Sequence, residues 1–187
     1  MPIINIEHTE QQLEAIDLAV EGFRQGCPLR VIGGYAGTGK TTSIKEIIQR
    51  VHNLQVVTFT GKASSVLRNR GVNSQTIHST IYEWDPDCDE FFLKESIGCD
   101  GFIIDEASMV GKDLYNDLES FGLPILAVGD PGQLEPIGDS SISLMDSPDI
   151  VLEEIHRQAK GSEIIKLATR IRKNGAHGLK LQEKPGC

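Results

Sequence analysis

The chain has 187 residues, of which 39% are hydrophobic and 24% are charged, and its formal net charge is −9. These totals suit one globular domain of ordinary size with a sizeable core, and they exclude a protein that coats nucleic acid by bulk positive charge. The sequence contains no apolar run long enough for a membrane span and no basic leader followed by an apolar stretch. Its four cysteines are scattered, without a C-x-x-C pair. We therefore expect a cytoplasmic or nucleoid-associated protein that is not secreted and has no membrane partner.

The predicted elements alternate between helix and strand. Helices are assigned where apolar residues recur every three or four positions, and strands where short runs are β-branched or apolar. In chain order we expect a helix over 10–23, a strand over 30–34, a helix to about 51, a strand over 55–59, a helix over 63–70, a strand over 101–104, a helix over 112–121, strands over 123–128 and 150–152, and a helix over 162–174. This alternation predicts an α/β fold with a mostly parallel central sheet flanked by helices.

An acidic stretch near residues 80–98 interrupts the alternation and predicts a small hairpin insertion, most of it in residues 82–98. The aromatic residues of this stretch are Tyr82, Trp84, Phe91 and Phe92. They could stack on nucleic acid bases or form a strand-separating pin, or they could anchor the hairpin to the domain. Residues 1–174 are expected to form one domain, and residues 175–187 a flexible tail or the start of a further domain.

The segment after the strand over 30–34 reads GYAGTGKTT, which is the pattern of a phosphate-binding loop. Its glycines let backbone N–H groups turn around an anionic phosphate, and the helix that follows presents its N-terminus to the same anion. Lys40 would reach the β- and γ-phosphates, and the hydroxyl of Thr41 would ligate Mg²⁺. The loop predicts a nucleotide site, with an ordinary Gly-rich turn as the alternative. Its expected nucleotide contacts are Gly34, Ala36, Gly37, Thr38, Gly39, Lys40, Thr41 and Thr42.

Two other strands end in polar residues that such a site needs. Asp105 and Glu106 follow an apolar strand, where an acid can hold a metal and its neighbour can polarise the attacking water. The alternative is a surface acidic pair at the start of a helix. Gln133, in GDPGQLEP, either senses the γ-phosphate and water or is a solvated residue of a Pro-Gly turn. Spacing alone does not choose between these two interpretations of Gln133.

The motifs GYAGTGKTT, TFTGKAS, TIHS, IIDEASMV, GDPGQLEPIG and LEEIHRQ follow one another in the chain. In this order they resemble the motif series of superfamily-one DNA helicases, above all the RecD/Dda-like branch, which moves 5′ to 3′ on single strands. The resemblance extends from residue 9 to about residue 173. It implies a P-loop NTPase of the RecA-like type, the first motor domain of such a helicase, with ATP and Mg²⁺ as cofactors and single-stranded DNA as partner.

The resemblance also implies roles for single residues. Gln12 resembles the glutamine that contacts adenine, and Gln133 resembles the residue that couples the γ-phosphate to DNA. Asp105 corresponds to the metal ligand that acts with Thr41. Arg157 resembles the arginine that reaches the γ-phosphate, although a cation at a helix end is the alternative for this residue. The implied catalytic set is Lys40, Glu106, Gln133 and Arg157.

For DNA, TFTGKAS and TIHS resemble the segments that hold the phosphates of the single strand. The contacts would use hydroxyl, ammonium and backbone groups. The residues implied are Thr60, Lys62, Ser64, Thr76 and His78. Taken alone, His78 is as consistent with an ordinary core or surface histidine.

Nothing after residue 174 resembles the second motor domain of the family, which carries a further DNA-contact motif and another catalytic arginine. We therefore expect the chain alone to be weakly active or inactive, and to need a second motor domain or a protein partner for unwinding. Two alternatives stay open. One is a non-catalytic, nucleotide-dependent DNA-binding or adaptor module, and the other is a P-loop phosphotransferase.

Overall fold

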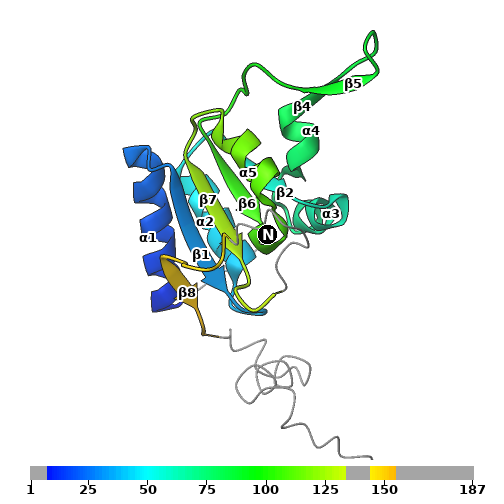
Figure 1. Ribbon diagram of the computed structural model, residues 1–187. Helices are drawn as coiled ribbons and strands as arrows, with labels where there is room; N and C mark the ends of the chain where they lie inside the picture. The colour runs from blue at the N-terminus through cyan, green and yellow to red at the C-terminus, as the bar shows by residue number, and fades with distance from the viewer. Residues whose placement is uncertain (1–7, 134–143, 155–187) are drawn as a thin grey trace, which may run out of the picture.

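The computed structural model describes residues 8–133 and 144–154 of the chain. The predicted helix over 162–174, Arg157 and the predicted tail over 175–187 lie outside these residues. Figure 1 shows helices on both faces of a twisted sheet. In chain order the elements are α1 (Glu10–Gln25), β1 (Leu29–Gly34), α2 (Lys40–Arg50), β2 (Leu54–Thr58), α3 (Gly61–Asn69), β3 (Ser74–Thr76), α4 (Ile77–Ile81), β4 (Tyr82–Asp85), β5 (Glu90–Leu93), β6 (Gly101–Asp105), the short 3₁₀ helix η1 (Ala107–Met109), α5 (Lys112–Glu119), β7 (Ile125–Gly129) and β8 (Ile150–Leu152).

The main sheet has six strands in the order β3-β2-β6-β7-β1-β8. Every pairing between these strands is parallel, so the predicted parallel α/β sheet is confirmed. Each carboxyl end of a parallel strand lies at the same edge of the sheet, and ligands of open α/β sheets bind at that edge. The architecture therefore places the loops after β1, β2, β6 and β7 side by side.

The four inner strands β1, β2, β6 and β7 bury side chains on both faces, as parallel strands covered by helices do. In β6, Phe102 and Ile104 pack into the core layer that contains α4 and α5, whereas Ile103 packs into the opposite layer with α1 and α2. Successive side chains of a strand point to opposite faces, so one strand serves both layers. The run of apolar residues before Asp105 is thus explained by burial on both sides.

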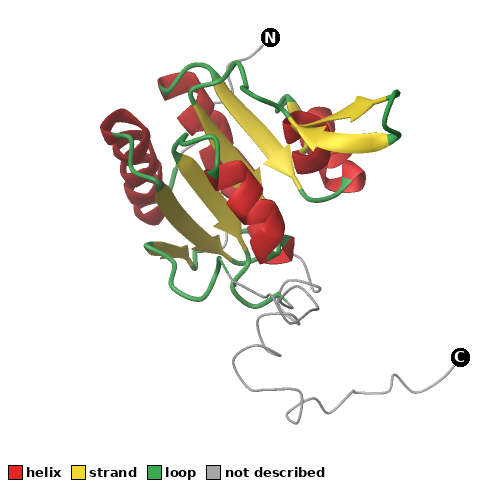
Figure 2. Cartoon of the chain, turned by 45° about the horizontal axis from the view of Figure 1, so that its top comes forward, coloured by secondary structure: helices red, strands yellow, loops and turns green. Residues whose placement is uncertain are grey.

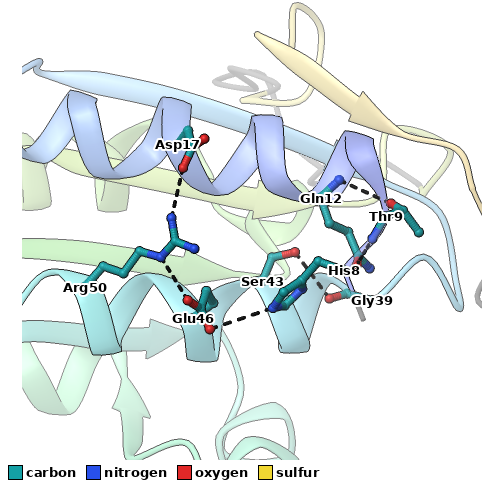
Figure 3. Close-up of polar contacts among 8 residues, drawn as sticks. All are labelled: His8, Thr9, Gln12, Asp17, Gly39, Ser43, Glu46 and Arg50. Atoms are coloured by element: carbon teal, nitrogen blue, oxygen red, sulfur yellow. Dashed lines mark hydrogen bonds and ion pairs between the residues drawn. The ribbon is translucent and has the colours of Figure 1, made fainter. Parts of the chain in front are cut away.

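Helix α1 is fixed at its N-terminus and along its length. Thr9 forms a capping box with Gln12, in which each side chain bonds the backbone N–H of the other. Arg50, in the last turn of α2, pairs with Asp17 of α1 at 2.9 Å and with Glu46 of its own helix at 2.8 Å. Figure 3 shows that these contacts hold α1 alongside α2, with the capping box next to the start of α2. Within the described ranges no helix is long and apolar enough to cross a membrane.

The predicted hairpin insertion is confirmed. Strands β4 and β5 pair antiparallel, with Trp84 opposite Phe91, and Figures 1 and 2 show the hairpin extending away from the main sheet. The short elements before it, β3 and α4, were not predicted from the sequence. They place the TIHS motif at the edge strand next to β2.

Candidate functional site

The polar residues expected to act together follow separate strands, and the structure brings them to one edge of the sheet. β1 leads into the phosphate-binding loop, β6 ends at Asp105, and β7 leads into Asp130. β7 lies between β1 and β6, and the three strands are parallel. Their carboxyl ends are therefore neighbours, and this edge is the candidate site.

The phosphate-binding loop needs its glycines for two different reasons. A Cβ atom at Gly34 would lie 3.0 Å from the side chains of both Lys40 and Thr38, so only glycine leaves room for the lysine to fold back over the loop. Gly37 and Gly39 have φ angles of 84° and 87°, which L-residues with a side chain rarely adopt. The loop conformation thus follows directly from the three glycines.

Lys40 begins α2 and folds its ammonium onto the loop. Its Nζ atom donates to the carbonyl oxygens of Gly34 and Tyr35, and the Thr38 hydroxyl also donates to the Tyr35 carbonyl, at 2.8 Å. The ammonium is thus held inside the cradle where phosphate oxygens bind in loops of this type. The expected nucleotide contacts that follow, Thr41 and Thr42, lie in the first turn of α2 and are partly exposed.

Gln12 is placed differently from the adenine contact that the resemblance implies. Its side chain is 0% exposed. The Nε2 atom donates to the Thr38 carbonyl at 2.7 Å, and the Oε1 atom accepts from the Thr9 N–H at 3.0 Å. The amide therefore ties the start of α1 to the phosphate-binding loop. Contact with a base would require it to turn away from these partners, so adenine binding by Gln12 stays a proposal.

Asp105 is the last residue of β6 and Glu106 follows it. Both residues are held in conformations or surroundings that lower the stability of the fold. Burial of Asp105 raises the pKa of its carboxyl group, while the positive charges of Lys40 and Arg70 act in the opposite direction. Glu106 has a φ angle of 57° and lies in the left-handed region, which is strained for a long side chain. A buried acid beside a strained residue at a strand end is typical of a functional position.

Arg70 is a site residue that the sequence patterns did not identify. It follows the last turn of α3, and its Nη1 atom donates to the Thr41 hydroxyl at 3.2 Å. Arg70 and Thr41 are 29 positions apart and belong to different helices. No motif or periodicity relates two such positions, so only the folded structure could reveal this contact.

Gln133 lies close to the strand end of β6 as well. The Ser108 hydroxyl, in η1, donates to the Gln133 Oε1 atom at 3.1 Å. Asp130 accepts from the Gly132 N–H at 2.9 Å and forms the tight turn that the Pro-Gly pair predicts. The turn and the link to η1 coexist, so Gln133 is both a turn residue and a neighbour of the Asp105–Glu106 pair.

The two segments expected to contact DNA also meet in space. Thr58 of β2 pairs with Thr76 of β3, so the loops after these strands are adjacent. Thr60 caps α3 by accepting from the Ala63 N–H at 3.2 Å, and Thr76 caps α4 by accepting from the Ser79 N–H at 3.2 Å. Two helix N-termini with threonine caps thus face the same edge of the sheet, where they could receive phosphates.

Ser64, one of the predicted DNA contacts, has a buried side chain. It is 1% exposed, and its hydroxyl donates to the Ser74 carbonyl at 2.9 Å while accepting from Arg68 at 2.7 Å. These bonds fasten α3 to β3. A DNA contact at Ser64 would therefore have to use its backbone or require the side chain to leave these partners, and it stays a proposal.

The remaining predicted DNA contacts are exposed. Lys62 lies in the first turn of α3. Among the described residues, no acidic side chain forms a salt bridge with it. His78 is exposed on α4, and its ring lies 5.8 Å from that of Tyr82 and 6.3 Å from that of Phe59, measured between centroids. The ammonium of Lys62 faces solvent, whereas His78 is part of an aromatic cluster.

The hairpin aromatics divide into two groups. Tyr82 packs against the core and donates a hydrogen bond to the Asp117 carboxylate of α5, so it anchors the hairpin. Trp84 and Phe91 pair edge to face with centroids 4.9 Å apart, and they are 47% and 70% exposed. The anchor interpretation therefore holds for Tyr82, and the exposed pair remains available for stacking.

Comparison with known proteins relates this arrangement to one family. The AAA_30 family model, described as an AAA domain, matches residues 7–187. The chain is 32% identical over 162 residues to the conjugal transfer protein TraA of Agrobacterium fabrum, covering 80% of this chain and 14% of TraA. It is 26% identical over 185 residues to the ATP-dependent DNA helicase dda of Enterobacteria phage T4, covering 88% of this chain and 42% of that helicase. The chain thus spans less than half the length of either relative.

Solved structures share the fold at lower identity. Bacteroides Pif1 bound to single-stranded DNA superposes with a TM-score of 0.64 at 22% identity, covering 90% of this chain and 46% of that one. Bacteroides Pif1 in complex with ADP-AlF4 gives 0.63 at 22% identity, covering 90% and 46%. Pif1 helicase from Candida albicans gives 0.64 at 22% identity, covering 89% and 44%. These superpositions establish a common fold over about half of each Pif1 chain.

Proposed function

We propose that this chain, which belongs to the AAA_30 family, is a RecA-like motor domain of the Pif1/Dda/RecD-like branch of superfamily one. In this proposal it binds and hydrolyses ATP in a DNA helicase that acts on single-stranded DNA. By family likeness the movement is 5′ to 3′. We further propose that residues 1–174 form this motor domain and that residues 175–187 are a tail or the start of a further domain.

One observation carries the proposal. The phosphate-binding loop after β1 and the acidic pair after β6 lie at the same edge of one parallel sheet. The loop holds an ammonium group, Lys40, over its own carbonyl oxygens, and Asp105 supplies a buried carboxylate across β7. Phosphoryl transfer in P-loop enzymes requires both parts together.

The residues present fit a magnesium ion that arrives with its nucleotide. Mg²⁺ is usually bound through one or two protein ligands together with substrate phosphates and water. The described part of the chain contains no cluster of three acidic, histidine or cysteine side chains that could hold a metal unaided. Thr41 and Asp105 are the residues that would hold the ion. When bound, it would neutralise charge that develops on the phosphates.

The other residues take the roles that their positions allow. Lys40 would bind the β- and γ-phosphates, Glu106 would orient and polarise the attacking water, and Gln133 would report the state of the γ-phosphate to η1 through Ser108. Arg157 is proposed from its motif alone, since it lies outside the described residues. Because Asp105 is proposed as the metal ligand, Glu106 is the acid that remains to polarise the water.

Single-stranded DNA would lie over the ends of β2 and β3. There the caps of α3 and α4 present Thr60, Thr76 and backbone N–H groups, and Lys62 adds a charge. Groups of these kinds make most protein contacts to phosphates. A second motor domain or a protein partner would supply the other grip that translocation requires. The relative dda is an ATP-dependent DNA helicase by name, which supports the proposal.

The experiment compares two proteins. The chain itself should bind ADP in the presence of magnesium and should bind a dT oligonucleotide more weakly as salt rises. A protein that also contains the second motor domain should hydrolyse ATP, and single-stranded DNA should stimulate that hydrolysis. ATP hydrolysis that single-stranded DNA does not stimulate in the two-domain protein would refute the helicase assignment.

Two variants map the DNA contact in the same experiment. Lys62→Ala should weaken oligonucleotide binding and reduce its salt slope by about one. Arg24→Ala removes the same charge from the last turn of α1, at the opposite edge of the sheet, and should change neither quantity. Binding of ATP and DNA without turnover, even with the second domain present, would favour the adaptor module instead.

A further inference from the structure

Arg70 makes a contact that the proposed nucleotide site does not explain. Its guanidinium donates to the Thr41 hydroxyl at 3.2 Å from the end of the neighbouring helix α3. Thr41 is the residue whose hydroxyl would face the magnesium ion of a bound nucleotide. The positive charge of Arg70 therefore lies on the side of the site where a metal cation would have to bind.

The other proposed metal ligand is the buried carboxylate of Asp105. Asp105 is 9% exposed, and within the described ranges it has no cation at salt-bridge distance. Lys40 donates to the loop carbonyls in the nucleotide-free chain, whereas Arg70 contacts the site through the Thr41 hydroxyl.

A guanidinium and a magnesium ion cannot share this position at low cost. Two cations a few ångströms apart repel each other, and the repulsion is stronger near a buried carboxylate than in water. The Arg70 side chain is exposed and has a flexible stem, so it can swing into solvent. Arg70 is the C-cap residue of α3, and its backbone N–H donates to carbonyl oxygens of the last turn. The side chain takes no part in these bonds, so it can move while the helix stays folded.

We propose that Arg70 occupies the metal side of the nucleotide-free site, where it holds the Thr41 hydroxyl, and that it is displaced when a magnesium–nucleotide complex binds. The inference rests on the proposed function, since it concerns the same site. It assigns Arg70 as a positioning residue that sets how much magnesium the domain needs in order to hold a nucleotide tightly.

The test measures nucleotide affinity as a function of magnesium. A fluorescent ADP analogue is titrated onto the full chain in EDTA and at a series of free Mg²⁺ concentrations. Arg70→Ala should lower the Mg²⁺ concentration at half-maximal tightening by about five- to tenfold, which is the size expected for loss of one exposed hydrogen bond of ordinary net strength. Arg70→Gln keeps a donor for Thr41 without the charge and should give a smaller shift. Arg24→Ala, a matched loss of charge far from the site, should give none.

Several outcomes would overturn the inference. Arg70→Ala and Arg70→Gln could both keep the wild-type magnesium dependence, which would make Arg70 an ordinary surface residue. Arg70→Ala could weaken ADP binding by the same factor with and without magnesium, which would make Arg70 a phosphate ligand that stays in place. Failure of the wild-type chain to bind ADP at any magnesium concentration would refute the proposed function itself, a result that the two preceding outcomes cannot mimic. Thermal unfolding of each variant without nucleotide verifies that the fold is intact.

Discussion

At the scale of single residues, the end of β6 shows how function is placed at a cost to stability. Three non-glycine residues of the described chain have positive φ angles, namely Asn53, Asp89 and Glu106. Asn and Asp tolerate this region because their short polar side chains bond locally, whereas a glutamate gains no such compensation. Strain of this kind persists where the surrounding structure enforces it, commonly at active sites. The position of Glu106 thus supports a catalytic role independently of its motif.

The first prediction separates nucleotide binding from turnover. Lys40→Ala removes the ammonium that would contact the phosphates and should weaken ADP binding at least tenfold, about 1.4 kcal/mol. Glu106→Gln preserves size and should leave ADP affinity within about twofold, while ATP turnover in the two-domain protein falls by about 10² or more, as for the loss of a general base. Fluorescent ADP titration and a phosphate-release assay measure the two quantities. Equal losses of ADP affinity in both variants would contradict this division of roles.

The second prediction concerns the cost of burying Asp105. Its pKa is raised in the folded state, so its contribution to stability is present below the unfolded pKa and is lost as pH rises through the folded value. At neutral pH the charged form therefore destabilises the nucleotide-free domain. Asp105→Asn should raise the melting temperature by about 2–4 °C for each kcal/mol relieved, and it should abolish the tightening of ADP binding by magnesium.

The pH dependence of the stability difference between Asp105→Asn and wild type provides the control for the second prediction. The stability difference between Asp105→Asn and wild type should vanish as pH falls below about 4, where the carboxyl group is protonated in both states. A melting temperature that drops on substitution at pH 7 would mean that the carboxylate is stabilised by Lys40 and Arg70 more than it is penalised by burial.

Some site residues could be predicted from the sequence and others could not. The phosphate-binding loop, Asp105 and Glu106 are contiguous motifs at strand ends, so pattern and position agree. Ser64 and Gln12 were assigned to ligands from motifs, but the structure buries both and uses their polar atoms in the fold. Arg70 belongs to none of the recognised motifs, so no sequence pattern assigned it to the site. A motif gives the residue type and its place in the chain, whereas the direction of a side chain depends on tertiary packing.

At the scale of elements, the sequence predicts the periodic helices and the apolar strands, including the three-residue β8, but it misses β3 and α4. β3 has three residues and α4 has five, which is too short for a strand alternation or a helical face to be recognised. Both form because they make contacts with neighbouring elements of the fold. β3 pairs with β2, and Ile77 and Ile81 of α4 are fully buried in the core. Tertiary contacts rather than local preference therefore determine these elements.

The third prediction tests how the hairpin is attached to the domain. Burial and the neighbouring Asp117 raise the pKa of Tyr82 to about 12, above the usual value near 10. The contribution of Tyr82 to stability is therefore complete below pH 10 and is lost as pH rises through 12. Tyr82→Phe should cost about 1–2 kcal/mol at pH 8, the worth of a hydrogen bond to a charged acceptor, and progressively less above pH 10. Urea unfolding at pH 8 and pH 11 measures the difference, and an equal loss at both values would contradict the assigned hydrogen bond.

The fourth prediction concerns the exposed aromatic pair at the hairpin. Trp84 and Phe91 are flanked by acidic residues, which are Glu83, Asp85, Asp87, Asp89 and Glu90. Such a surface repels the phosphates of DNA. We therefore expect the double variant Trp84→Ala, Phe91→Ala to change dT oligonucleotide affinity by less than about twofold in an anisotropy titration, whereas Lys62→Ala weakens it. Quenching of Trp84, the only tryptophan of the chain, by the oligonucleotide would instead show base stacking.

At the scale of the whole molecule, α3 connects the two proposed ligand sites. Its N-cap Thr60 and first-turn Lys62 lie at the proposed DNA surface, and Arg70 follows its last turn at the nucleotide site. A nine-residue helix moves as a rigid unit, so a displacement at one end reaches the other. The serine pair Ser64–Ser74 fastens this helix to β3, the strand that leads into the second DNA segment. Helix α3 therefore connects the proposed DNA surface directly with Thr41 on the metal side of the proposed ATP site.

The last prediction follows from this connection. If DNA at the N-terminus of α3 draws Arg70 away from Thr41, a dT oligonucleotide should lower the Mg²⁺ concentration at half-maximal ADP tightening in the wild-type chain, by about fivefold, the lower end of typical coupling between sites. Coupling between binding sites is reciprocal, so Mg²⁺–ADP should strengthen oligonucleotide binding by the same factor. In Arg70→Ala the cation to be displaced is already gone, and the oligonucleotide should have no further effect on the magnesium requirement. An equal shift in wild type and Arg70→Ala would show that DNA reaches the nucleotide site by another route, such as the Gln133–Ser108 contact.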